Sequence, residues 1–287
     1  IGGIKMFSKI LYPTKFDEFS LPILKSLVCL KSAGLKEIVL LYVIDEDAIY
    51  FAKESELPVD IEKIKDSVNK KMQEYIDYLK STGLEAKTKI VSGKVVNELI
   101  KEANLENVSL IVTGRHKRHM MDELFIGSTT DGVIKKSSLP VLVIKYHTIK
   151  MIEGKLTEQF CPNLFRKILY ATDWSEHSER AKNYMPFLYN AGAREAVIVH
   201  VMEDGSRQDR ELKLNALKQD FEKIGFKVSY HLIHGKPYKE IINLASEQDV
   251  SLILMGSLGK GFIKGILLGS VSQRVLEYSD RSVFIVK

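Results

Sequence analysis

The sequence predicts an α/β protein of two tandem domains, each built around an open, doubly wound sheet of five parallel strands. Three observations carry this prediction: one unit occurs twice, each copy alternates short apolar runs with helical patterns, and runs such as residues 38–43 (IVLLYV) are apolar on both faces. Strands that are apolar on both faces are typical of parallel sheets covered by helices on both sides. A chain of 287 residues is long enough to bury two such cores.

The repeat has two registers. Residues 9–14 (KILYPT) match residues 167–172 (KILYAT) at an offset of 158, whereas farther along an offset of 142 carries Gly127-Ser128 onto Gly269-Ser270. The difference of 16 residues indicates one insertion in the first copy, around residues 51–66. The expected organisation is a first domain over 1–145, a linker of mixed charge without clear periodicity over 146–165, and a second domain over 166–287.

The elements follow from the apolar runs and the helix stop signals. Runs such as residues 38–43 (IVLLYV) are short and rich in β-branched residues, which favours strands. Gly34 and Gly83 follow longer amphipathic segments, where a left-handed residue ends a helix, and Gly192 and Gly225 repeat this in the second copy. In the first copy we expect strands near 9–14, 37–43, 85–91, 109–113 and 140–145, and helices near 19–33, 61–82, 95–104 and 128–137. In the second copy we expect strands near 167–172, 195–201, 226–233, 251–255 and 282–287.

Composition argues against several classes of protein. Apolar residues make up 45% and charged residues 28% of the chain, and the net charge of +5 is too small an excess to indicate a nucleic-acid or membrane partner. No apolar run is long enough to span a membrane and no signal peptide is visible, so we expect a cytoplasmic protein. Cys29 and Cys161 give no disulfide framework, which is typical of a reducing compartment, and the apolar helical surroundings of Cys29 indicate core packing.

A glycine-rich loop lies between the fourth strand of the second copy and the next helical pattern. In residues 255–273 (MGSLGKGFIKGILLGSVSQ), Gly256 and Gly259 open the loop and Gly269-Ser270 closes it. Glycines allow close backbone approach, and the first amides of a helix have no intrahelical partners, so this segment is suited to hold phosphate. It is not a Walker A loop, because Gly259-Lys260 is followed by glycine and not by Ser or Thr. The alternative is that the glycines only punctuate a surface loop.

The order Gly-x2-Gly-x9-Gly-Ser after a strand resembles the nucleotide-binding motif of the universal stress protein family, in its ATP-binding branch. The resemblance covers nearly the whole chain in both copies. It implies a Rossmann-like fold of the adenine nucleotide alpha hydrolase type, with strand order 3-2-1-4-5 in each domain. It also implies an adenine nucleotide (ATP, ADP or AMP) as ligand, with or without Mg²⁺, and a stress-response or regulatory role.

The resemblance assigns roles to residues of the second copy. Asp173 accepts hydrogen bonds from the adenosine moiety, the backbone of Val201 meets the adenine, and Ser270 donates its hydroxyl to phosphate. The alternative for Asp173 is a turn or N-cap residue, and the alternative for Val201 is a buried strand residue. No catalytic residue is expected. The expected nucleotide-binding residues are Thr172, Asp173, Val201, Met255, Gly256, Gly259, Gly269, Ser270, Val271 and Ser272.

The first copy departs from the motif at two positions. Lys15 stands where the second copy has Asp173, and Lys117 where it has Gly259, although Gly127-Ser128 remains. A lysine ammonium cannot accept the hydrogen bonds that a carboxylate accepts. We therefore expect a degenerate site in the first domain, kept for structure or for another anion.

Two classes of function remain open: a regulatory protein that binds nucleotide with little or no hydrolysis, and an adenine-nucleotide hydrolase or transferase of the same fold superfamily. Residues 256–272 contain no Asp, Glu or His that would serve as general base or metal ligand, which favours the regulatory protein. His116 and His119 lie in a basic loop that offers no further metal ligands and no aromatic residues for a nucleic acid, so we expect a solvated loop.

The last strand of each copy predicts how the two domains meet. By the strand order of the family, residues 140–145 (PVLVIK) and 282–287 (SVFIVK) are sheet edges, and neither carries a charge before its final lysine. Bare edges of this kind aggregate unless they are covered. We expect the two strands to pair within the chain and whole chains to form a homodimer. The alternative is that the same edges pair between chains.

Overall fold

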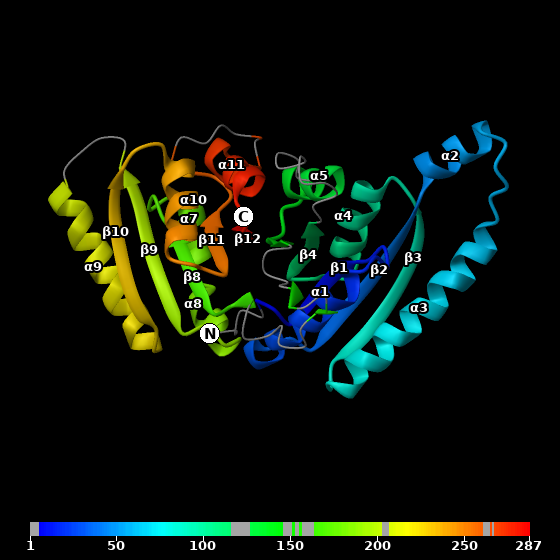
Figure 1. The fold of residues 1–287 in the computed structure, drawn as a ribbon, viewed down its shortest axis with the longest axis horizontal. Coiled ribbons are helices and arrows are strands. Elements are labelled where there is room, and N and C mark those ends of the chain that lie inside the picture. The colour runs from blue at the N-terminus through cyan, green and yellow to red at the C-terminus, as the bar shows by residue number, and fades with distance from the viewer. Residues whose placement is uncertain are drawn as a thin grey trace.

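The computed structural model describes residues 6–115, 127–145, 151–152, 155–156, 164–202, 207–260, 265 and 267–287. Ten strands of this part of the chain form one sheet, and helices cover both of its faces (Figure 1). Two further short strands, β6 (Met151–Ile152) and β7 (Lys155–Leu156), pair with each other between the two halves of the sequence.

The first half forms five parallel strands in the order β3-β2-β1-β4-β5, as predicted. The predicted helix near 19–33 is an α-helix that tightens into a 3₁₀ segment, η1 (Val28–Ala33), before the left-handed Gly34. The predicted insertion forms α2 and the start of α3. The strands are β1 (Lys9–Pro13), β2 (Glu37–Asp45), β3 (Glu85–Gly93), β4 (Leu110–Arg115) and β5 (Val141–Lys145). The helices are α1 (Ser20–Leu27), α2 (Glu46–Glu54), α3 (Ile61–Ser81), α4 (Val95–Leu105) and α5 (Ser128–Lys136).

The second half repeats this topology as β10-β9-β8-β11-β12. Pro186 lies in the first turn of α8, where its missing N–H costs least, and separates α8 from α7. The strands are β8 (Lys167–Ala171), β9 (Glu195–Met202), β10 (Lys227–His234), β11 (Leu252–Gly256) and β12 (Ser282–Val286). The helices are α7 (Glu176–Lys182), α8 (Met185–Asn190), α9 (Arg207–Ile224), α10 (Pro237–Glu247) and α11 (Ser270–Tyr278).

The two halves join through their last strands, which confirms the predicted pairing. β12 and β5 are antiparallel, with Val283 opposite Val143, Phe284 opposite Leu142 and Ile285 opposite Val141. The seam, as we call this β5–β12 pairing, lies in the middle of the sheet (Figure 1). Both strands are buried, and each pairs with backbone N–H and C=O groups that the other would otherwise expose at a sheet edge.

Two apolar layers, one on each face of the sheet, run through both halves. Ile10 of β1 enters one layer and Leu11 enters the other, as alternate side chains of a strand must. Phe7 of the first half packs against Tyr184 and Phe284 of the second, with ring centroids 5.5 and 6.1 Å apart. The two halves therefore share their core.

One expectation about the cysteines is wrong. Cys29 is buried, as predicted, but it is disulfide-bonded. Cys161 lies outside the described residues. Two cysteines far apart in a sequence carry no signal of pairing, because a disulfide depends on tertiary distances. The argument from the cysteines for a reducing compartment therefore does not hold. Separately, no helix among the described residues is long and apolar enough to cross a membrane.

Candidate functional site

A cavity of about 720 Å³ opens in the second half at the carboxyl ends of β8, β9 and β11. Helix α7 packs on one face of the sheet and α11 on the other, so the cavity lies at the switch point of a doubly wound sheet. All ten residues predicted for the nucleotide site line this cavity. The structure thus brings them together, and their role as nucleotide ligands stays a prediction.

The N-terminus of α11 forms one wall of the cavity. Gly269 is its N-cap, in extended conformation, and has no side chain to cap the helix. The N–H of Gln273 donates the first helical hydrogen bond to the carbonyl of Gly269 at 2.9 Å. The amides of Ser270, Val271 and Ser272 therefore have no partner within the helix. Such amides, together with the positive end of the helix dipole, favour an anion at this wall.

Asp173 also lines the cavity, and it accepts hydrogen bonds from two backbone segments. One carboxylate oxygen accepts a hydrogen bond from the N–H of Ser175, and the other accepts from the N–H of Lys260, each at 3.0 Å. Asp173 is thus a turn residue, which was the alternative raised by the sequence. It also binds the backbone of the glycine-rich loop. A carboxylate has about four acceptor positions, so further hydrogen bonds to a ligand remain open to it.

Two glycines of the loop are required by packing within the protein. A Cβ on Gly259 would lie 2.8 Å from a carboxylate oxygen of Asp173. A Cβ on Gly256 would lie 2.6 and 2.7 Å from backbone atoms of His177 and Ser178, where α7 crosses β11. The sequence attributed both glycines to close approach of a ligand. Within the protein, Gly259 leaves room for the Asp173 carboxylate and Gly256 leaves room for α7.

Two of the predicted hydroxyl groups are already engaged. The Ser272 hydroxyl lies 3.0 and 3.1 Å from the carbonyl oxygens of Gly256 and Ser257 and ties α11 to the loop. The Thr172 hydroxyl accepts from the N–H of Trp174 at 3.0 Å. Ser270, by contrast, is exposed at the cavity. Of these three hydroxyls, that of Ser270 is the one best placed for a phosphate.

His200 and Arg210 also line the cavity, and the prediction omitted both. The ring Nδ1 of His200 lies 2.8 Å from the carbonyl oxygen of Thr172, and its Nε2 lies 2.5 Å from the Arg210 guanidinium. A carbonyl only accepts and a guanidinium only donates, so the arrangement fits a neutral imidazole with its proton on Nδ1. Burial lowers the pKa of His200, which favours this neutral form.

Comparison of the chain with known protein families gives the same family for both halves. The model of the universal stress protein family matches residues 6–145 and 164–287. The chain belongs to the universal stress protein family. Its two halves are two tandem domains of that family.

Similar proteins match the chain either by halves or as a whole. Universal stress protein MJ0577 of Methanocaldococcus jannaschii is 30% identical over 155 residues, which cover 43% of this chain and 96% of that protein. Universal stress protein YxiE of Bacillus subtilis is 28% identical over 148 residues, which cover 43% of this chain and all of that protein. The crystal structure of a universal stress protein from Archaeoglobus fulgidus covers 98% of this chain and 97% of its own, with 27% identity and a TM-score of 0.74. The last match spans both tandem domains.

The first universal stress protein domain carries different residues at the positions of the cavity. Lys15, exposed, replaces the Asp173 carboxylate, and Tyr42 and Val68 stand at the positions of His200 and Arg210. Lys117, His116 and His119 lie outside the described residues. The positions that are described therefore lack the acceptor and the histidine–arginine pair of the second domain.

The described residues do not form a metal site. They contain no group of three His, Cys, Asp or Glu side chains close enough to hold a metal ion. Among the described residues that line the cavity, Asp173 is the one carboxylate, and it is bound to two amides. These residues do not fit a protein-bound Mg²⁺, which prefers oxygen ligands in octahedral geometry.

The sequence offered a signal for one of the two missed residues. His200 interrupts an otherwise apolar strand near its carboxyl end, where polar side chains face a ligand crevice. Arg210 belongs to an exposed amphipathic helix, and its reach into the cavity depends on how α9 packs beside β9. No local pattern reports that packing.

Proposed function

We propose that this universal stress protein is a stress-response regulator that binds one adenine nucleotide (ATP, ADP or AMP) in its second domain, with little or no hydrolysis. The observation that supports it best is the cavity lined by both Asp173 and the N-terminus of α11. In this proposal the first domain spans residues 1–145, the linker 146–165 and the second domain 166–287, and the site of the first domain is degenerate.

The cavity has the size and the polarity that a nucleotide requires. Its volume of about 720 Å³ is within the range of small-ligand sites. Phosphates would contact the amides of Ser270 and Val271, Asp173 would accept from the adenosine hydroxyls, and the base would lie against Val201 and Ile241. Lys260 and Arg210 add positive charge to the lining.

The lining residues explain why hydrolysis would be slow. A general base needs a lone pair within reach of the attacking water. The Nε2 lone pair of His200 faces Arg210, and both oxygens of Asp173 accept backbone N–H groups. Multiple rapid turnovers of ATP by protein free of contaminating ATPase would move the protein into the hydrolase class.

Calorimetry with ATP tests the proposal. We expect one site per chain, and Asp173→Ala should weaken binding by about 1–3 kcal/mol, roughly 5- to 150-fold. Lys15→Ala, at the equivalent exposed position of the first domain, is the matched control and should leave the affinity unchanged. Two equal sites, or full affinity in Asp173→Ala, would contradict the assignment.

A further inference from the structure

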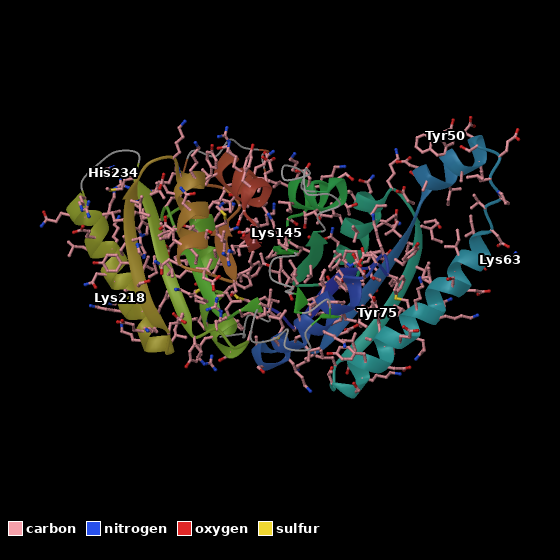
Figure 2. All side chains as sticks on the ribbon, in the orientation of Figure 1. Tyr50, Lys63, Tyr75, Lys145, Lys218 and His234 are labelled. Carbon is pink, nitrogen blue, oxygen red and sulfur yellow. The ribbon has the colours of Figure 1, made fainter. Side chains whose placement is uncertain are left out.

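A lysine of the first domain caps the helix that forms the phosphate wall of the second. Lys145 ends β5, only 3% of it is exposed, and it lies near the middle of the molecule (Figure 2). Its ammonium donates to the carbonyl oxygens of Leu276 and Ser279, both at 2.5 Å. Those carbonyls form the C-terminus of α11. The helix therefore has the cavity at one end and a buried cation of the other domain at its other end.

The repeat produces the reciprocal contact. Lys287, which follows Lys145 by 142 residues, donates to the carbonyl oxygen of Ile134 in α5 at 2.6 Å, and Ile134 is the counterpart of Leu276. Lys287 also donates to the carbonyl oxygen of Leu267, in the glycine-rich loop, at 2.8 Å. Lys287 of the second domain thus links Leu267 to Ile134 of the first domain, and Lys145 of the first domain contacts the end of α11 directly.

The position of Lys145 matters electrostatically because α11 is short. A helix of nine residues is marginal without outside contacts. A cation at the C-terminus and an anion at the N-terminus each stabilise the same aligned peptide dipoles. Without the ammonium, two buried carbonyls would lose their partner, and the last turn of α11 would be free to fray.

We infer that Lys145 is a positioning residue of the nucleotide site, so that the first domain completes the site of the second. The inference rests on the proposed function. It gives the first domain a role that does not require a ligand of its own. Because coupling between two equilibria is reciprocal, phosphate bound at α11 also strengthens the contact between the domains.

Titration of the Lys145→Met variant with ATP and with adenosine tests the inference. Methionine keeps most of the apolar stem and removes the charge. The affinity for ATP should fall on the order of tenfold, whereas that for adenosine, which has no phosphate, should stay within about twofold. Leu142→Ala is the control, because it weakens β5 at its pairing with Phe284 in the apolar layer on the face of the sheet opposite α11, and both affinities should remain those of the unchanged protein.

Hydrogen exchange of the unchanged protein gives a second measurement, which does not depend on the folding of a variant. Saturating ATP should slow exchange at residues 141–145 and 276–279, and saturating adenosine should not. If the unchanged protein binds neither ligand, the proposed function fails. If it binds ATP and Lys145→Met binds ATP equally well or loses both ligands equally, or if ATP protects the second domain alone, the inference about Lys145 is overturned.

Discussion

Asp173 and Gly259 act as a pair, and the two domains differ at both members. The Asp173 carboxylate can take this position only because residue 259 has no side chain: a Cβ on Gly259 would lie 2.8 Å from a carboxylate oxygen. In the first domain the corresponding residues are Lys15 and Lys117. An ammonium at position 15 cannot accept the two backbone hydrogen bonds that the Asp173 carboxylate accepts. The residue that allows this contact and the residue that makes it are thus both changed in the first domain.

Gly259→Lys gives the second domain the residue type that the first domain has at the equivalent position, Lys117. The new side chain should displace Asp173 from the Lys260 amide and weaken ATP binding by at least tenfold, since a hydrogen bond to a charged group contributes about 1.5–3 kcal/mol. Calorimetry measures the affinity, and circular dichroism checks the fold. Gly127→Ala is the control, because its added Cβ has no atom within 4 Å. Normal binding by Gly259→Lys would mean that the glycine only shapes the loop.

At the scale of residues, the sequence predicted where the site lies better than what each group does. The resemblance to the family motif named ten residues, and all ten line one cavity, because the carboxyl ends of parallel strands meet at one edge. It did not predict that Gly256 makes room for α7, or that the Ser272 hydroxyl is turned to the loop backbone. It also missed Arg210. Each of these facts depends on contacts between elements.

At the scale of elements, the end of α4 carries a cluster of charges. Lys9 of β1 and Lys87 and Lys89 of β3 approach the carboxylate of Glu106 to 2.8, 2.7 and 3.1 Å. The hydrogen bond from Lys87, followed by that from Lys9, lowers the pKa of Glu106 to about 2. The second domain has Gln248 at this position. The two domains should therefore differ in their response to acid.

Glu106→Gln tests this difference. The pKa of the folded state lies below the ordinary value of 4.5, so the cluster stabilises the fold above pH 4.5 and loses its effect as the pH falls to about 2. The lysines are partly exposed and screened by solvent, which reduces the contribution to about 1–2 kcal/mol. Denaturant unfolding should show Glu106→Gln less stable than the unchanged protein by that amount at pH 7 and equal to it near pH 2. Glu74→Gln, on the exposed face of α3, should show no such convergence.

The sequence predicted the location of the insertion in the first domain but not its helix α2. The change of register located it, but its structure could not be predicted from an apolar face. Helix α2 buries none of its residues, and Tyr50 and Phe51 are 60% and 67% exposed. Strands such as β5 and β12, which are apolar and buried on both faces, were predicted closely for the opposite reason.

At the scale of the whole molecule, the shared core predicts that both domains unfold together. Phe7→Ala removes a ring that packs against Tyr184 and Phe284 across the seam and should cost about 3–5 kcal/mol. Trp174 fluorescence reports on the second domain, and hydrogen exchange in β2 reports on the first. Both midpoints should fall equally. The exposed Phe51→Ala is the control and should shift neither. Two separate transitions would contradict a common core.

Because the two domains that meet at the seam belong to one chain, they are always present in a ratio of one to one. Two identical subunits joined through such strands would carry identical sites, and a substitution that removed one site would remove both. Within one chain, each domain meets its partner at a local concentration on the order of millimolar, so the pairing does not depend on the amount of protein made. Dilution therefore does not separate the two domains, and every molecule carries Lys15 in its first domain and Asp173 in its second.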